Sequence, residues 1–174
     1  MMNSDMQNLV SELHGAFCRL EILRFDEDYT GVLGKPCSAA QLGAAAQDLG
    51  RDLPPSYRAF LEFHNGWTDF IGEAALLAVE DRHTEWFQRR LVGIRDHLKS
   101  FGDPDFVPHA FFLLVHPDVS TVLFLDKNSP KPGGELEVVE FCLRDGELGR
   151  YPSFEEYLRR RLQETEQFIV DEEG

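Results

Sequence analysis

Long apolar runs and cysteines are both scarce in this sequence. No run approaches the ~20 apolar residues that a membrane-spanning helix needs. The first residues, MMNSDMQNLVSELHG, have neither the basic nor the apolar region of a signal peptide. The three cysteines, Cys18, Cys37 and Cys142, are odd in number and far apart, which is typical of reduced thiols rather than of a disulfide framework. These absences predict a cytoplasmic protein.

Positive charge is scarce as well. The 174 residues include 31 acidic and 17 basic side chains, so the formal net charge is −14. The imbalance grows along the chain, from 15 acids and 10 bases in residues 1–100 to 16 acids and 7 bases in residues 101–174. A field of this sign repels nucleic-acid phosphates and anionic lipids, so we expect neither as a partner, and it attracts basic proteins. The same charge would also serve solubility alone.

Motifs of the common enzyme classes are missing. The sequence contains no G-x-S-x-G, H-E-x-x-H or C-x-x-C, and its six histidines are scattered, so we expect no catalytic residue, no cofactor and no metal. The nearest approach to a metal motif is DEDYTGVLGKPC (26–37), which resembles the start of a calcium loop. It has Cys37 where such a loop requires a bidentate glutamate, so we interpret it as an acidic loop.

Other polar groups have simple explanations too. His116 and Asp118 would supply two ligands at a strand end, which is too few for a metal site. Glu135 and Glu137 share one face of a predicted strand and indicate a solvated surface. The three arginines at 159–161 have glutamates at helical spacing, which predicts ion pairs rather than a phosphate site.

Hydrophobic spacing predicts five helices. Ser38 and Gln41 form a capping box at the start of the second, and Gly50 follows its end. Pro54 and Pro55 suit the first turn of the third, and Asn65-Gly66 supplies its left-handed stop. Gly15 and the residues after Leu20 weaken the end of the first. A second capping box, Ser153 with Glu156, opens the last. The predicted spans are residues 6–20, 39–49, 54–65, 83–101 and 154–169.

Short apolar runs predict strands in the second half of the chain. They span residues 74–80, 110–116, 120–126 and 135–143, and a slip in alternation between Val138 and Val139 indicates a bulge in the last. Residues 24–38 and 127–134 read as irregular connections. Helices, then a meander of strands, then a closing helix predict an α+β domain with one antiparallel sheet of about four to six strands flanked by helices.

The stretch LPPSYRAFLEFHNGW (53–67) carries a resemblance to a known family. Together with FFLLVHPDVSTVLFLD (111–126) and YPSFEEYL (151–158), it resembles the SUKH superfamily, the Smi/Knr-like domains, over about residues 38–165. The hairpin turn departs from the family pattern, because Pro117 to Ser120 replace the usual glycine-bearing turn. The matching motif residues, mainly structural, are Leu53, Pro54, Tyr57, Phe60, Leu61, Asn65, Gly66 and Trp67.

The resemblance implies a binding domain without catalytic activity. Bacterial members of the superfamily are typically cytoplasmic immunity proteins that bind and neutralise a toxin domain, often a nuclease, and fungal relatives are linked to cell-wall synthesis and signalling. We divide the chain into an N-terminal helix and irregular extension (1–37), a Smi/Knr-like domain (38–168) and an acidic C-terminal tail (169–174).

The segment that follows the motif is the candidate partner-binding surface. In one interpretation, which we favour, Trp67 packs on the sheet as a lid over the core and leaves Asp69 and Phe70 near the surface. In the other, Trp67 itself lies at the rim of a site for a basic protein. The candidate partner-binding residues are Trp67, Asp69, Phe70 and Glu73.

Three functions follow as hypotheses. The first is an immunity protein whose acidic face binds a basic toxin domain, since complementary charge speeds encounter and would mask a nuclease site. The second is a housekeeping adaptor or regulatory domain of the same fold, with residues 1–37 supplying an additional contact to one of the cell's own proteins. The third is an enzyme of unrecognised type, which the missing catalytic motifs disfavour.

Overall fold

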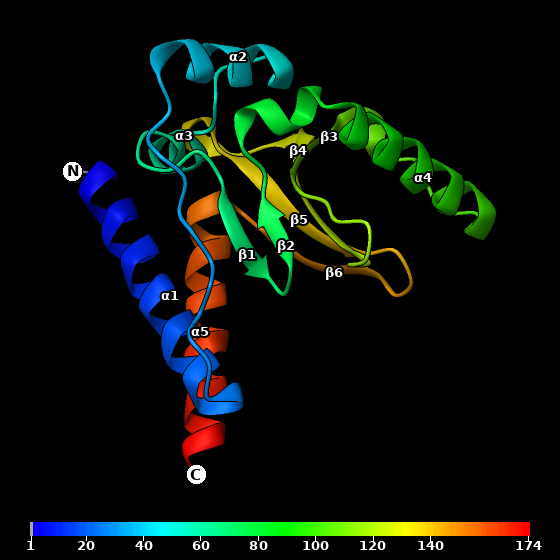
Figure 1. Ribbon diagram of the computed structural model, residues 1–174. Coiled ribbons are helices and arrows are strands. Elements are labelled where there is room, and N and C mark those ends of the chain that lie inside the picture. Colours follow the sequence, from blue (N-terminus) through cyan, green and yellow to red (C-terminus); the bar gives the residue numbers. More distant parts are fainter. Residues whose placement is uncertain (1) are drawn as a thin grey trace.

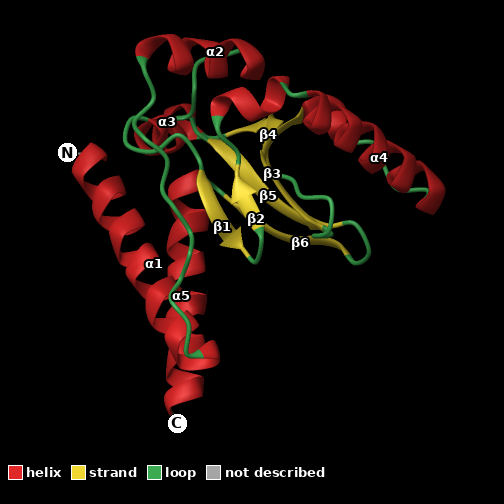
Figure 2. Cartoon of the chain, viewed as in Figure 1, coloured by secondary structure: helices red, strands yellow, loops and turns green. Residues whose placement is uncertain are grey.

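Six antiparallel strands form one sheet in which each strand pairs with its neighbour along the chain, in the order β1-β2-β3-β4-β5-β6. The computed structural model describes residues 2–174. The α+β class and the antiparallel sheet predicted from the sequence are confirmed (Figures 1 and 2). The strands are β1 (Trp67–Ile71), β2 (Ala74–Leu76), β3 (Ala110–Leu114), β4 (Thr121–Pro130), β5 (Leu136–Cys142) and β6 (Gly146–Tyr151).

Helices pack on both faces of this sheet. α1 and α5 lie side by side, run in the same direction and extend beyond the strands at their C-terminal ends, while α4 lies on the other side of the sheet (Figure 1). None of the helices in the described part of the chain has the length and apolar character of a membrane span. The helices are α1 (Met2–Phe25), α2 (Ala39–Leu49), α3 (Pro55–Leu61), α4 (Glu85–Phe101) and α5 (Phe154–Glu173), with short 3-10 turns at Val79–His83, Val107–His109 and Pro132–Gly134.

The two faces of the sheet bury separate apolar clusters. Phe111 and Leu113 face the larger cluster, together with α1, α3 and α5, whereas Phe112 between them faces α4. Val138 and Val139 divide in the same way, and both are fully buried. The predicted bulge between these valines is wrong, because both faces of β5 are covered and apolar neighbours therefore fit an unbroken strand.

Two helix ends differ from the prediction. α1 continues past Leu20 to Phe25 because its last turns pack against α5, where Arg24 Nε lies 2.9 Å from Glu172 Oε1. α5 likewise runs through the predicted tail to Glu173. The capping box at Ser38 is confirmed. At Ser153 only the serine half of the predicted box is described, with Glu156 N donating to Oγ at 3.1 Å.

α3 ends at Leu61, four residues earlier than predicted. The Leu61 carbonyl accepts a hydrogen bond from Cys37 N at 2.9 Å, and Asn65 N donates to Lys35 O at 2.7 Å. These are the two groups that would pair to continue the helix. The connection between α1 and α2 takes both of them, so it sets the end of α3.

The same connection covers one edge of the sheet. Thr68 N donates to Val32 O at 3.0 Å, Gly34 N donates to Gly66 O at 2.9 Å, and Leu33 forms an isolated antiparallel bridge with Trp67. An edge strand exposes unpaired backbone groups that invite unwanted pairing. We call residues 32–35 the edge segment. These residues form hydrogen bonds with part of the outer edge of β1, whose backbone groups would otherwise be unpaired.

Strand boundaries also differ in places. β1 and β6 were not predicted, and the run at 74–80 forms only the three-residue β2 before the chain turns into a 3-10 helix. β4 continues through residues 127–130, which the sequence placed in a loop. A register shift in the pairing of β5 with β6 occurs between Glu140 and Phe141.

Candidate functional site

The motif residues of α3 are buried and attach that helix to the sheet. Tyr57 Oη accepts a hydrogen bond from Arg82 Nη2 at 3.0 Å, and the Arg82 guanidinium lies 4.2 Å from the centre of the Phe111 ring. Phe60 packs edge-on against Phe154, with ring centres 5.3 Å apart. The buried members in and before α3 are Leu53, Pro54, Tyr57, Phe60 and Leu61.

Asn65 and Gly66 fix the path of the chain from α3 into β1. Asn65 Oδ1 accepts from Val79 N at 2.8 Å, and its Nδ2 donates to Glu80 Oε2 at 2.9 Å. Gly66 has a φ of 88°, and a Cβ on it would lie 2.9 Å from the carbonyl oxygen of Leu76. Gly66 therefore serves the backbone path, and the Asn65 amide oxygen and nitrogen are each engaged within the fold.

A bulge at Asp69 decides which residues of the candidate segment are exposed. Asp69 has a left-handed φ of 51°, and the pairing of β1 with β2 shifts register between Trp67 and Ile71. Side chains three positions apart lie on opposite faces of a regular strand, but this bulge turns both Trp67 and Phe70 inward. The two rings pack edge-on, with centres 5.1 Å apart.

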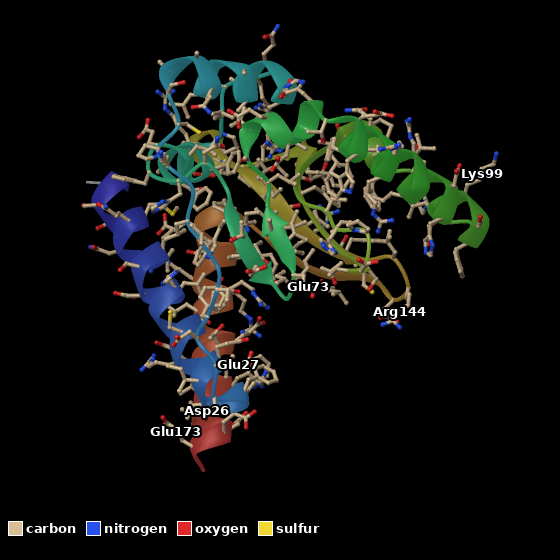
Figure 3. All side chains as sticks on the ribbon, viewed as in Figure 1. Asp26, Glu27, Glu73, Lys99, Arg144 and Glu173 are labelled. Atoms are coloured by element: carbon tan, nitrogen blue, oxygen red, sulfur yellow. The ribbon has the colours of Figure 1, made fainter. Side chains whose placement is uncertain are left out.

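The exposed fractions of these side chains can be compared with the burial that the sequence predicted for the segment. Trp67 is 1% exposed, so its place as a lid within the core is confirmed. The expected exposure of Phe70 is wrong, since it is 2% exposed. Asp69 is half-buried and Glu73 is exposed, at the turn between β1 and β2 (Figure 3). The two acids are therefore the members of the candidate set that a partner can reach.

Tyr29 and Thr30 join the connection to this bulge. Tyr29 Oη accepts from Trp67 Nε1 and donates to the Asp69 carbonyl, both at 3.0 Å, and Thr30 Oγ1 donates to Asp69 Oδ2 at 2.9 Å. Burial raises the pKa of Tyr29 far above its ordinary value, against a smaller opposing effect of the Trp67 hydrogen bond. The phenol therefore stays protonated and keeps its hydrogen bond to Asp69.

A groove of about 560 Å³ opens beside these residues. Its walls come from the second half of α1, from Tyr29 and Thr30, from residues 69–73 of the β1–β2 turn, and from Arg161 to Phe168 of α5. We call it the α1–α5 groove. Both reachable acids of the candidate segment, Asp69 and Glu73, line it.

The groove is surrounded by negative charge. Residues 21–30 and 161–174 together carry nine acids and two bases, so these 24 residues hold half of the net charge of −14. Asp26, Glu27 and Glu173 lie at the end of the molecule where α1 and α5 stop, whereas Lys99 and Arg144 lie on the opposite side (Figure 3). α4, with four bases and two acids, has a net positive charge. The acidic character of the protein is thus concentrated at one end.

Polar groups singled out elsewhere in the sequence are engaged in the fold. The predicted ion pairs of the arginine run are confirmed, since Arg159 pairs with Glu155 and the next two arginines with Glu164. Glu135 is not merely solvated, because its carboxylate accepts from Ser56 N and Oγ, both at 2.8 Å, at the start of α3.

The described part of the chain contains no cluster of metal-ligating side chains. Within residues 2–174, no group of three or more His, Cys, Asp or Glu side chains is placed to hold a metal ion. The three cysteines are unpaired. Asp118 N donates to His116 Nδ1 at 3.2 Å, which is an ordinary turn contact.

Several groove residues were not candidates on sequence alone. Glu21 and Tyr29 are far in the chain from Phe168, and the packing of α1 beside α5 brings the two parts together. A signal was present in the acidic stretch 26–28 and in the acidic end of the last helix, which share one sign of charge. Nothing in their spacing indicated that they meet.

A comparison with known protein families matches most of the chain. A sequence model of the SMI1 / KNR4 family (SUKH-1) matches residues 36–160. The matched range includes α2, α3, α4 and all six strands, and it ends within α5. α1, the connection up to residue 35 and the remainder of α5 lie outside it. No curated protein sequence matches the chain.

Proposed function

This chain belongs to the SMI1 / KNR4 family (SUKH-1), and on that premise we propose that it is a non-catalytic protein-binding domain. Its role is that of a cytoplasmic immunity protein, which binds a toxin domain and neutralises it. Family membership is the observation that carries this proposal, because the family includes immunity proteins. Residues 38–168 form the family domain in this proposal, and residues 1–37 and 169–174 are additions to it.

The charge distribution supports a basic partner. Half of the net charge lies at the end formed by α1, its connection and α5, next to the α1–α5 groove. A concentrated negative potential steers a basic protein toward one face and raises the association rate. A nuclease that binds nucleic-acid phosphates carries such a basic surface, so blocking that surface would neutralise it.

An adaptor or regulatory domain of the same fold is the second candidate. The observation that favours it is the position of α1, which lies outside the matched range yet packs into the main core. A segment of this kind offers a partner additional contacts. The target would then be one of the cell's own proteins, connected with the cell wall or with signalling.

Affinity capture separates the two proposals. The tagged protein is incubated with native lysate at about 0.05 M salt and again at about 0.5 M salt, where exposed charges are largely screened. The immunity proposal predicts capture of a toxin domain, lost or weakened at high salt, that becomes inactive when the two proteins are mixed. Capture of a cellular enzyme or regulator supports the adaptor role, and a captured toxin that stays fully active contradicts neutralisation.

A further inference from the structure

Three carboxylates lie at the α1–α5 groove, and one oxygen of one of them, Asp69 Oδ2, already accepts a hydrogen bond from Thr30 Oγ1 at 2.9 Å. No ion pair within residues 2–174 involves Glu21, Asp69 or Glu73. The lining holds these three carboxylates against two arginines, of which Arg24 pairs with Glu172 at 2.9 Å and Arg161 contacts Glu164, which Arg160 shares, at 3.4 Å. The charge left over in the groove is therefore negative.

Apolar surface accompanies these carboxylates. Phe168, which lines the groove, is 45% exposed, and the Arg24 guanidinium covers one side of its ring at 5.0 Å from the centre. Half of the large apolar side chains that are exposed within residues 2–174 lie at the ends of α1 and α5. They are Ile22, Leu23, Phe25, Phe168 and Val170. Among these five, Phe168 lines the groove, and an exposed aromatic ring with a polar rim indicates a binding surface.

The groove lies where the range matched by the family model meets segments outside that range. Asp69 and Glu73 belong to the range matched by the family, whereas Glu21 and Phe168 lie outside it. The walls outside the matched range are thus supplied by α1, by Tyr29 and Thr30, and by the part of α5 after residue 160. A groove assembled in this way can select one partner among those that related domains bind.

We propose that the α1–α5 groove binds a segment of the partner protein in which a basic residue lies next to an apolar residue. A lysine or arginine of that segment lies among the carboxylates of Glu21, Asp69 and Glu73, and a neighbouring apolar side chain packs on Phe168. α1 and the end of α5 determine which partner is accepted. This inference rests on the proposed protein-binding function and identifies the surface and the chemistry that perform it.

Other occupants fit the groove less well. A nucleic acid or another polyanion would meet uncompensated carboxylates and the acidic end around them. An apolar segment without positive charge would leave those carboxylates unpaired in a contact that excludes water. A cation flanked by an apolar side chain satisfies both parts of the lining, because it pairs with the carboxylates while its neighbour covers the ring.

The groove can be tested with a defined probe before any partner is known. The probe is the blocked peptide Gly-Lys-Leu-Phe-Lys-Gly, titrated into isotope-labelled protein while backbone amide NMR signals are followed. We expect shifts confined to residues 20–30, 69–73 and 161–170 that diminish with added salt. The same peptide with glutamate in place of lysine should cause no such shifts. Shifts spread over acidic residues on every face would overturn the proposal.

Matched variants separate the groove from net charge. The double variant Glu21→Lys/Glu73→Lys should weaken peptide binding by about tenfold or more. The control Asp96→Lys/Asp103→Lys makes the same change in net charge on and beside α4, away from the groove, and should change binding by less than about twofold. Equal losses in both variants would show that only overall charge matters.

A second pair tests the apolar anchor. Phe168→Ala should weaken binding, whereas Phe101→Ala, which removes a ring 70% exposed at the end of α4, should not. A cooperative thermal denaturation curve for each variant checks that the variant is folded. If a captured toxin binds the Glu21→Lys/Glu73→Lys variant as tightly as the wild type, the groove proposal fails and the immunity proposal stands. If the peptide binds in the groove but no toxin partner is captured, the groove proposal stands and the immunity proposal fails.

Discussion

At the scale of single residues, Gly66 combines two constraints that can be separated experimentally. Its φ of 88° disfavours any side chain, and a Cβ would also meet the Leu76 carbonyl at 2.9 Å. Gly102 has a similar φ of 73° with open space around it. We expect Gly66→Ala to lower the free energy of unfolding by roughly 2 kcal/mol or more, and Gly102→Ala by about 1 kcal/mol. Urea denaturation measures both, and equal losses would contradict a steric role for Leu76.

Two glutamates on β5 should give pH dependences of opposite sign. Burial, opposed by the nearby Arg161 charge, raises the pKa of Glu140. The folded protein thus holds this proton at a pH where the unfolded chain has lost it, and Glu140 reduces stability as the pH rises above the ordinary glutamate value of 4.5. Glu140→Gln removes that reduction. The stability of the variant relative to the wild type should therefore be more favourable at pH 7 than at pH 4.

Glu137 is the matched control on the same strand. Hydrogen bonds from Lys131 and then Arg150 lower the pKa of Glu137. The stability that it contributes is present above pH 4.5 and is lost as the pH falls through its folded value. Glu137→Gln should accordingly be less favourable, relative to the wild type, at pH 7 than at pH 4. Denaturation curves at the two pH values measure both variants, and a shared sign would count against this account.

At the scale of elements, the edge segment makes a prediction about β1. A Cβ at Gly34 would lie 2.1 Å from the Asn65 carbonyl oxygen, so Gly34→Ala must push residues 32–35 away from the strand. We expect faster hydrogen exchange at the amides of Gly34 and Thr68, which donate to Gly66 O and Val32 O. The exposed edge should also make the variant more prone to aggregate. Unchanged exchange at both amides would show that the edge segment gives way without leaving β1.

The elements that were missed from sequence depend on contacts with distant parts of the chain. β1 lacks strand alternation because the bulge at Asp69 turns Phe70 inward, and the partner of that bulge, Thr30, comes from the connection. β6 has few apolar side chains and is defined by its pairing with β5. The end of α3 is set by Cys37 and Lys35. The capped helices and buried strands were predictable, because their signals are local.

The candidate site shows the same division. The acids Asp69 and Glu73 were identified from their place after the motif, and both line the groove. Glu21 and Phe168 were not, since only the pairing of α1 with α5 brings them to it. The acids that were identified from sequence therefore lie within the range matched by the family model, and those groove residues that were missed lie outside it.

At the scale of the whole molecule, uneven charge should limit stability. The last turn of α5 contains acids and no base, next to the negative end of the helix dipole, and more acids surround it. We expect Asp171→Asn/Glu173→Gln to raise the free energy of unfolding by roughly 0.3–1 kcal/mol per residue at low salt. Raising the salt should stabilise the wild type more than this variant. Thermal denaturation at two salt concentrations tests this, and a wild type that is destabilised by salt would contradict it.

The separation of the basic α4 from the acidic ends of α1 and α5 also gives the molecule a permanent electric moment. In the field of a positively charged surface, such a molecule rotates before it touches. The protein should therefore adsorb to an anion-exchange matrix in one preferred pose, with the α1–α5 end against the matrix and α4 toward the solvent. A label attached to α4 would remain accessible in that pose, whereas one near the α1–α5 groove would be shielded.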